Sequence, residues 1–206
     1  MIWPGEDEAW DLLGKCDPVT LQTAARAIFD PGSSTYVLTC FGQDIHISLK
    51  ERIIAGSTPI GKYLVEELSE SSRLSILRYL LDAREEPLSG KLINPADLPG
   101  GGILLQGTHV LPLAEVAHKF ADSPGQFLKQ GRSLAGFPAA YGDTALQLFP
   151  FPRLPVVLIL WSGDEEFPPR STLLLDASAV LHLPMDVIWA ASAMILRMML
   201  CDLPGV

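Results

Sequence analysis

Alternation between apolar and polar residues is clearest in the last third of the chain. Residues 144–149 alternate as a half-buried strand does, because successive side chains of a strand point to opposite faces. Residues 156–161 are apolar without interruption, which is typical of a strand covered on both faces. Residues 173–175 form a further apolar run, so this region predicts at least three strands.

A hairpin and several helices are predicted in the rest of the chain. Residues 36–40 and 45–49 alternate on either side of Gly42, which indicates two paired strands. Elsewhere apolar residues recur every three or four positions, as on the buried face of a helix. This spacing predicts helices over residues 6–15, 18–27, 59–81 (interrupted near 70–72), 113–121, 126–134 and from about 184 to 200.

These elements predict an α+β fold with a mainly antiparallel sheet and helices grouped around it. The strands come in hairpins and meanders, and they do not alternate regularly with helices as a doubly wound fold requires. The chain has 206 residues, no internal repeat and no long linker, so we expect a single domain over residues 1–206. Hydrophobic residues make up 48% of the sequence, which is enough to bury a sizeable core.

Charge and cysteine content narrow the expected partners and location. The net charge is −9 and the basic residues are scattered, which predicts no binding to nucleic acid or to a membrane surface. A small molecule, a cation or a basic protein segment is a more suitable partner for a chain with this negative charge. The first residues are acidic where a signal peptide would be basic, and the apolar stretch 187–200 is shorter than the roughly 20 residues that span a bilayer. We therefore expect a cytoplasmic protein, with Cys16, Cys40 and Cys201 as free thiols.

The acidic turn Asp164, Glu165 and Glu166 is the most suggestive chemical feature. It follows the apolar run that ends at Trp161 and precedes Phe167. Adjacent carboxylates repel one another unless a cation or water relieves them, and oxygen-rich loops suit hard cations such as Mg²⁺ or Ca²⁺. The alternative is an exposed hairpin turn whose charges only keep a sheet edge soluble.

Two further features could belong to the same site. Asp143 and Asp176 lie at predicted strand ends, where they could join Asp164 in a carboxylate cluster or serve only as turn and cap residues. Gly100 and Gly101 belong to a glycine-rich loop, which could bring backbone N–H groups close to an anion or could simply be a tight connection. The order of the strands decides between these possibilities, and the pattern does not give it.

Several short motifs in the sequence resemble a known family. The first stretch comprises residues 87–93 (PLSGKLI) and 98–101 (LPGG), and the second comprises residues 141–143 (YGD), 152–155 (PRLP), 160–168 (LWSGDEEFP) and 175–178 (LDAS). Together they resemble the uncharacterised family called domain of unknown function 3786, found mostly in anaerobic bacteria and archaea. Some members carry an additional cysteine-rich segment that looks like an iron–sulfur domain, and this sequence does not contain it. The resemblance covers almost the whole chain and is most specific at W-x-G-D-E-E-F-P. It gives a functional acidic turn the same weight as a turn that only keeps the sheet edge soluble.

Three functional hypotheses follow. The first is a ligand- or cofactor-binding accessory protein, which the resemblance places in anaerobic metabolism. The second is a hydrolase or transferase that uses carboxylates, with or without Mg²⁺. The third is a homodimeric interaction protein that pairs through the helix carrying Trp189, Met194, Met198 and Met199. The alternative for this helix is that it simply closes the core of the monomer. The predicted binding residues are Asp143, Trp161, Asp164, Glu165, Glu166, Phe167, Asp176, Gly100 and Gly101, whereas catalytic residues, metal ligands and the cofactor stay open.

Overall fold

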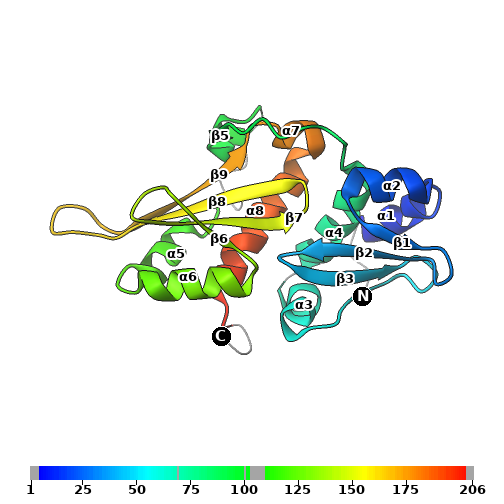
Figure 1. The fold of residues 1–206 in the computed structure, drawn as a ribbon, viewed down its shortest axis with the longest axis horizontal. Coiled ribbons are helices and arrows are strands. Elements are labelled where there is room, and N and C mark those ends of the chain that lie inside the picture. The colour runs from blue at the N-terminus through cyan, green and yellow to red at the C-terminus, as the bar shows by residue number, and fades with distance from the viewer. Residues whose placement is uncertain (1–4, 69, 100, 103–109, 203–206) are drawn as a thin grey trace.

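The N-terminal half of the protein is a four-stranded antiparallel sheet with helices beside it (Figure 1). The structure is a computed structural model and describes residues 5–68, 70–99, 101–102 and 110–202. The elements of this half are α1 (Glu6–Leu13), α2 (Pro18–Ala25), β1 (Ile28–Asp30), β2 (Thr35–Cys40), β3 (Gln43–Ser48), β4 (Ile53–Gly56), α3 (Pro59–Lys62), a π-helix (Tyr63–Glu67) and α4 (Glu70–Asp82). The predicted β2–β3 hairpin is confirmed.

Burial and turn geometry explain the β2–β3 hairpin. Tyr36, Leu38 and Ile45 are fully buried on one face, and residues between them face outward. The last pair of residues before the turn is Cys40 opposite Gln43. Between these two residues, Phe41 and Gly42 both have positive φ, as the two-residue turns that suit a twisted hairpin require.

The C-terminal half contains a five-stranded antiparallel sheet in the order β5-β9-β8-β7-β6. Its strands are β5 (Leu92–Ile93), β6 (Phe137–Ala139), β7 (Thr144–Phe151), β8 (Leu154–Trp161) and β9 (Arg170–Asp176). The continuous apolar run lies in β8, the central strand, whose residues are all buried except half-buried Trp161. The prediction of a strand covered on both faces is therefore confirmed.

Helices cover one face of this second sheet. These are α5 (Leu113–Phe120), α6 (Pro124–Ser133) and α8 (Met185–Leu200). Leu146, Leu158 and Leu173 point toward these helices and belong to the main core cluster, which includes residues of both sheets. On the opposite face Val157 and Ile159 belong to a separate, small cluster. Figure 1 shows α5, α6 and α8 gathered on one side of the sheet. The same half also contains a 3-10 helix (Pro95–Asp97) and the short helix α7 (Ala179–His182).

Three of the four methionines of α8 lie in the core. Met194, Met198 and Met199 are at most 1% exposed, so they close the core of the chain. They are therefore not exposed for contact with a second copy of the chain, which is the role that the homodimer hypothesis gave them. The homodimer itself stays a prediction, which the mass of the protein in solution tests.

Tyr79 and Arg153 connect the two halves. The Tyr79 hydroxyl donates to the carbonyl oxygen of Ala25 and accepts from the backbone N–H of Arg153, both at 3.1 Å. The guanidinium of Arg153 donates to the carbonyl oxygens of Ala24 and Thr23, in the last turn of α2. A positive charge is favourable there, because the C-terminal end of a helix carries partial negative charge. The junction is therefore a polar network inside the core.

The α+β class and the antiparallel pairing are confirmed. The sequence patterns did not show that the strands divide into two sheets. Within the described residues, no helix combines the length and the hydropathy needed to cross a membrane.

Candidate functional site

The β8–β9 hairpin ends in a tip, residues 162–169, that projects away from the helices (Figure 1). Pairing of the two strands stops at Trp161 and Arg170. Within the tip, the backbone N–H of Asp164 donates to the carbonyl oxygen of Phe167 at 2.9 Å. Oδ1 of Asp164 accepts hydrogen bonds from the backbone N–H groups of Glu166 (2.9 Å) and Phe167 (2.7 Å). Asp164 therefore folds the turn, which leaves its second oxygen for other contacts.

Asp143 reaches the same place from the neighbouring strand. It directly precedes β7, which is paired with β8, and its Oδ2 accepts a hydrogen bond from the backbone N–H of Ser162 at 2.9 Å. The preceding residue, Gly142, has a φ of +55°, and a Cβ there would lie 2.4 Å from Cγ2 of Ile159. Glycine at this position thus allows the loop to lie against the base of the hairpin.

These residues enclose a surface hollow of about 460 Å³, here called the tip hollow. The guanidinium of Arg170 lies over the Trp161 ring, 4.5 Å from its centre, which fixes both side chains at the base of the hollow. The hollow is lined by Asp143, Trp161, Ser162, Asp164, Phe167, Pro168 and Arg170. Four of the predicted binding residues (Asp143, Trp161, Asp164 and Phe167) are therefore brought together.

Glu165, Glu166 and Phe167 extend into solvent at the tip. The two glutamates are exposed and do not line the tip hollow, and Phe167 is 67% exposed. A phenylalanine that directly follows three carboxylates and stays exposed is not needed in a turn that serves only solubility, because exposing an apolar ring to water is unfavourable. The tip thus presents an exposed aromatic ring next to three carboxylates in the sequence.

Asp176 lies at the opposite end of β9 from the tip hollow. Its carboxylate is buried and accepts hydrogen bonds from the backbone and hydroxyl groups of Ser89 and Ser178 and from the backbone of Gly90, at 2.6–2.9 Å. Burial raises the pKa of Asp176, but the hydrogen bonds from Ser178 and Ser89 outweigh it, so the pKa lies well below its ordinary value. Asp176 therefore fastens the 89–91 loop to the sheet.

Gly101 of the glycine-rich loop does not line the tip hollow. Gly101 packs against the 3-10 helix, where a Cβ would lie 1.9 Å from the carbonyl oxygen of Pro95, and it is not among the residues that line the hollow. Gly100 lies outside the described residues. The glycine at position 101 thus serves a close backbone approach.

Metal and thiol chemistry find little support in the described part of the chain. Residues 5–68, 70–99, 101–102 and 110–202 contain no group of three or more His, Cys, Asp or Glu side chains placed to hold a metal ion. The three cysteines are free, as predicted. Cys40 is buried, and burial raises the pKa of its thiol far above the ordinary value, which suppresses the reactive thiolate.

Sequence reasoning missed Arg170 and Ser162 as site residues. Arg170 is the residue opposite Trp161 in the hairpin register, and Ser162 supplies only a backbone N–H. Extending the β8 and β9 patterns toward each other would have paired Trp161 with Arg170, because a hairpin fixes which residues face one another.

The position of Gly142 gives a direct test of how the hollow is built. Gly142→Ala is expected to lower the free energy of unfolding by about 1–3 kcal/mol, because alanine is strained at positive φ and its Cβ would collide with Ile159. Gly125→Ala is the matched control: Gly125 lies in the first turn of α6 with open space around it, so alanine should leave stability unchanged or raise it slightly. Urea unfolding followed by circular dichroism measures both. Equal effects of the two substitutions would contradict this account of Gly142.

Comparison with known proteins places the chain in a family. The sequence model of the family described as Domain of unknown function (DUF3786) matches residues 17–198. No curated protein matches the chain. No solved structure matches it either. Because the matched segment covers most of the 206 residues and includes the whole β8–β9 hairpin, the chain belongs to the DUF3786 family.

Proposed function

We propose that this protein is a binding module whose hairpin tip recognises a positively charged segment of another protein. The observation that supports it is the tip hollow, where Asp143, Asp164, Trp161 and Phe167 come together at the end of a projecting hairpin. Recognition by an accessory protein requires such an exposed surface and does not require a buried reaction site. The expectation of anaerobic metabolism as the setting rests on the family resemblance alone.

Charge supports a basic partner. Asp143, Asp164, Glu165 and Glu166 contribute four negative charges around the hollow, and Arg170 contributes one positive charge, which leaves a net charge of −3 (one minus four). The whole chain carries −9, so its long-range field also attracts cationic partners. Complementary charge of this kind increases the association rate and selects against acidic partners.

The aromatic residues supply anchoring. Phe167 is 67% exposed and would lose most of its exposed apolar surface under a partner segment. Trp161 is held by Arg170 and is already half-buried, so little conformational entropy is lost when a partner covers it. Exposed aromatic residues surrounded by polar ones are typical centres of binding energy at protein interfaces.

The exposure of the acidic side chains favours binding over carboxylate catalysis. A general acid or base at neutral pH needs burial or close like charges to shift its pKa. Glu165 and Glu166 are exposed and lie outside the hollow, and one oxygen of Asp164 is engaged with the backbone of its own turn. The hydrolase or transferase alternative has no comparable observation in its favour.

A charge-matched pair of variants tests the proposal. The probe is a short peptide of alternating arginine and alanine, and a peptide of alternating glutamate and alanine serves as the reference. In two-dimensional ¹H–¹⁵N NMR spectra, we expect the arginine peptide to shift the backbone amides of residues 161–167 and 170 and the glutamate peptide to leave them unchanged. Glu165→Gln with Glu166→Gln should weaken binding about five- to tenfold, since each exposed charge pair contributes below about 1 kcal/mol.

The control removes the same charge elsewhere. Glu85→Gln with Glu86→Gln changes two adjacent exposed glutamates far along the chain from the tip and should leave the affinity near that of the wild type. If both double variants weaken binding equally, the attraction belongs to the overall net charge, and the tip is not the recognition surface. Amide shifts spread over other segments would have the same meaning.

A further inference from the structure

Arg170 supplies the positive charge among the residues that line the tip hollow, and its guanidinium lies over an aromatic ring. The guanidinium carbon is 4.5 Å from the centre of the Trp161 ring. Asp143 and Asp164 line the same hollow, yet Arg170 forms no ion pair with either of them or with any other described residue. The ring therefore already carries a guanidinium, while no described residue forms an ion pair with the two aspartates.

Each of the two aspartates keeps one carboxylate oxygen for a partner. Oδ2 of Asp143 accepts the backbone N–H of Ser162, and Oδ1 of Asp164 accepts two backbone N–H groups of its own turn. Across residues 5–68, 70–99, 101–102 and 110–202, no group donates a hydrogen bond to Oδ1 of Asp143 or to Oδ2 of Asp164. Both side chains are exposed, so these oxygens can accept from a guanidinium, which carries five N–H donors in one plane.

The contact between Arg170 and Trp161 positions the ring and is weak enough to be exchanged. The two residues face each other as the last pair of the hairpin, and the Arg170 side chain is exposed. An exposed cation–π contact of this kind changes an equilibrium by only about two- to fivefold. The loop before β7 also contacts the ring, because a Cβ at Gly142 would lie 3.1 Å from Cε2 of Trp161. Trp161 therefore stays in place when Arg170 moves away.

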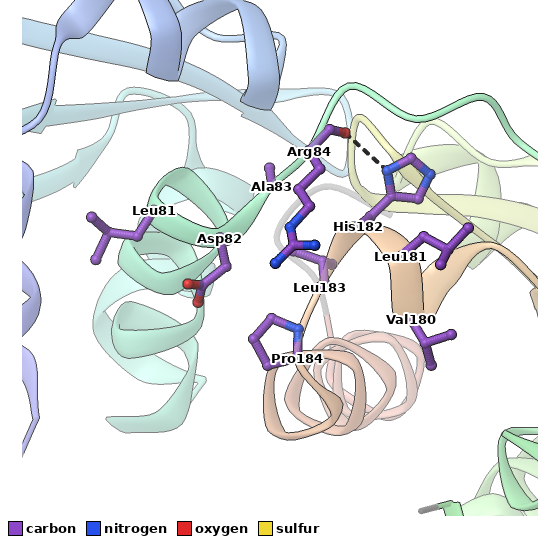
Figure 2. A pocket seen from close by; sticks show the side chains of 9 residues that line it. All are labelled: Leu81, Asp82, Ala83, Arg84, Val180, Leu181, His182, Leu183 and Pro184. Atoms are coloured by element: carbon purple, nitrogen blue, oxygen red, sulfur yellow. Dashed lines mark hydrogen bonds between the residues drawn. The ribbon is translucent and has the colours of Figure 1, made fainter. Parts of the chain in front are cut away.

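A second hollow of the protein shows the opposite arrangement of charges. It lies between the C-terminal end of α4 and the short helix α7, and its volume is about 310 Å³. Its carboxylate belongs to Asp82, which is ion-paired with Arg78 at 2.8 Å, and Figure 2 shows the Arg84 guanidinium directed toward the same carboxylate. The carboxylate of that hollow is thus matched within the protein, whereas the two aspartates of the tip hollow are not.

We propose that the residue recognised in the tip hollow is an arginine, and that Arg170 occupies its place in the free protein. The incoming guanidinium replaces that of Arg170 over the Trp161 ring and donates to the free oxygens of Asp143 and Asp164. Arg170 is then a specificity-determining residue, because a partner must compete with a stacked guanidinium. A planar guanidinium does so better than a lysine ammonium, which is a compact point charge. This inference rests on the proposed function, since it requires that a partner binds at the tip.

Two peptides of equal length and charge test the choice of arginine. One alternates arginine with alanine, the other alternates lysine with alanine, and each is titrated into the ¹⁵N-labelled full chain. From the amide shifts of residues 161–167 and 170, we expect the arginine peptide to bind at least about threefold more tightly. Equal affinities at these amides would overturn the inference and leave the proposed function in place. If neither peptide shifted these amides, both would be overturned.

The Arg170→Gln variant shows whether Arg170 competes with the partner. It removes the resident guanidinium and should raise the affinity for the arginine peptide about two- to fivefold, and the affinity for the lysine peptide by less. Arg132→Gln makes the same charge change on an exposed side chain of α6 and should leave both affinities near those of the wild type. An unchanged or lower affinity of Arg170→Gln, or an equal gain for the two peptides, would contradict a competing role of this side chain.

The Arg170 side chain reports the exchange directly in the wild-type protein. Its Nε–H proton belongs to the guanidinium over the Trp161 ring, where the ring current shifts its resonance upfield. Saturation with the arginine peptide should return this resonance to the position of an exposed arginine. An upfield shift that persists at saturation would show that Arg170 stays on the ring, and the proposed exchange would be wrong even if the affinities followed the expected order.

Discussion

Arg153→Met is expected to lower the free energy of unfolding by about 3 kcal/mol. The substitution keeps much of the aliphatic stem but removes charged hydrogen bonds to the carbonyl oxygens of Ala24 and Thr23, each worth about 1.5–3 kcal/mol when buried. Arg153 is 6% exposed, so water cannot replace those bonds readily. The favourable interaction of its charge with the C-terminal end of α2 is lost as well.

Urea unfolding followed by circular dichroism measures this effect. Arg132→Met is the matched control, because Arg132 is exposed on α6 and its replacement should change stability by no more than about 0.5 kcal/mol. If the two substitutions cost the same, the junction between the halves does not depend on the guanidinium. The Tyr79 ring stacks on Phe151 at a centroid distance of 4.4 Å, so the apolar part of the junction stays in place in the variant.

Asp176→Asn is expected to lower the free energy of unfolding by about 2–3 kcal/mol at neutral pH. Asparagine can still accept at one oxygen, but its amide nitrogen would face the backbone N–H of Gly90, which is also a donor. Replacing an acceptor by a donor at a buried position leaves both groups unsatisfied. The 89–91 loop should then detach from the sheet more easily, which faster hydrogen exchange at the Gly90 amide would show.

The pH dependence of stability gives a second measure of Asp176. Its pKa is lower in the folded than in the unfolded protein, so its contribution is fully present above the unfolded value of about 4. That contribution is lost as the pH falls below about 4 toward the folded value. Wild-type stability should therefore fall more steeply than that of Asp176→Asn in this acidic range. Asp122→Asn makes the same charge change on an exposed side chain, and parallel curves for all three proteins would contradict the role given to Asp176.

The sequence predicted the central elements of the fold and missed those at its edges. The apolar run in β8 and the alternation in β2 and β3 were readable because buried side chains repeat with a fixed period. By contrast, β1 and β4 are three and four residues long, and each exposes an isoleucine (Ile28, 69%; Ile53, 49%). Edge strands this short hold their conformation through hydrogen bonds to the neighbouring strand. Such bonds produce no pattern of apolar and polar residues in the strand itself.

The candidate site was predictable only where it is local in sequence. The acidic turn with Trp161 and Phe167 belongs to one hairpin, so its residues were bound to lie near one another. Asp143 joins them because β7 pairs with β8, which the pattern did not fix. Asp176 is separated from them by the length of β9, although it lies in the same strand as Arg170. The two ends of a strand are separated by about 3.3 Å for each residue of its length. The direction of each strand therefore decides which carboxylates lie at the same end of the sheet.

Because the hairpin tip projects from the body of the protein, substitutions there can change the surface that the tip presents without changing the stability of the fold. Phe167, Glu165 and Glu166 contribute nothing to the main core cluster, whereas Arg153 and Asp176 hold the body of the fold. Under the proposed function, random variation at residues 165–167 should therefore alter the choice of partner with little effect on folding yield. Selection could retune recognition in one lineage without compensating changes elsewhere, and a library randomised at these positions would contain mostly folded proteins.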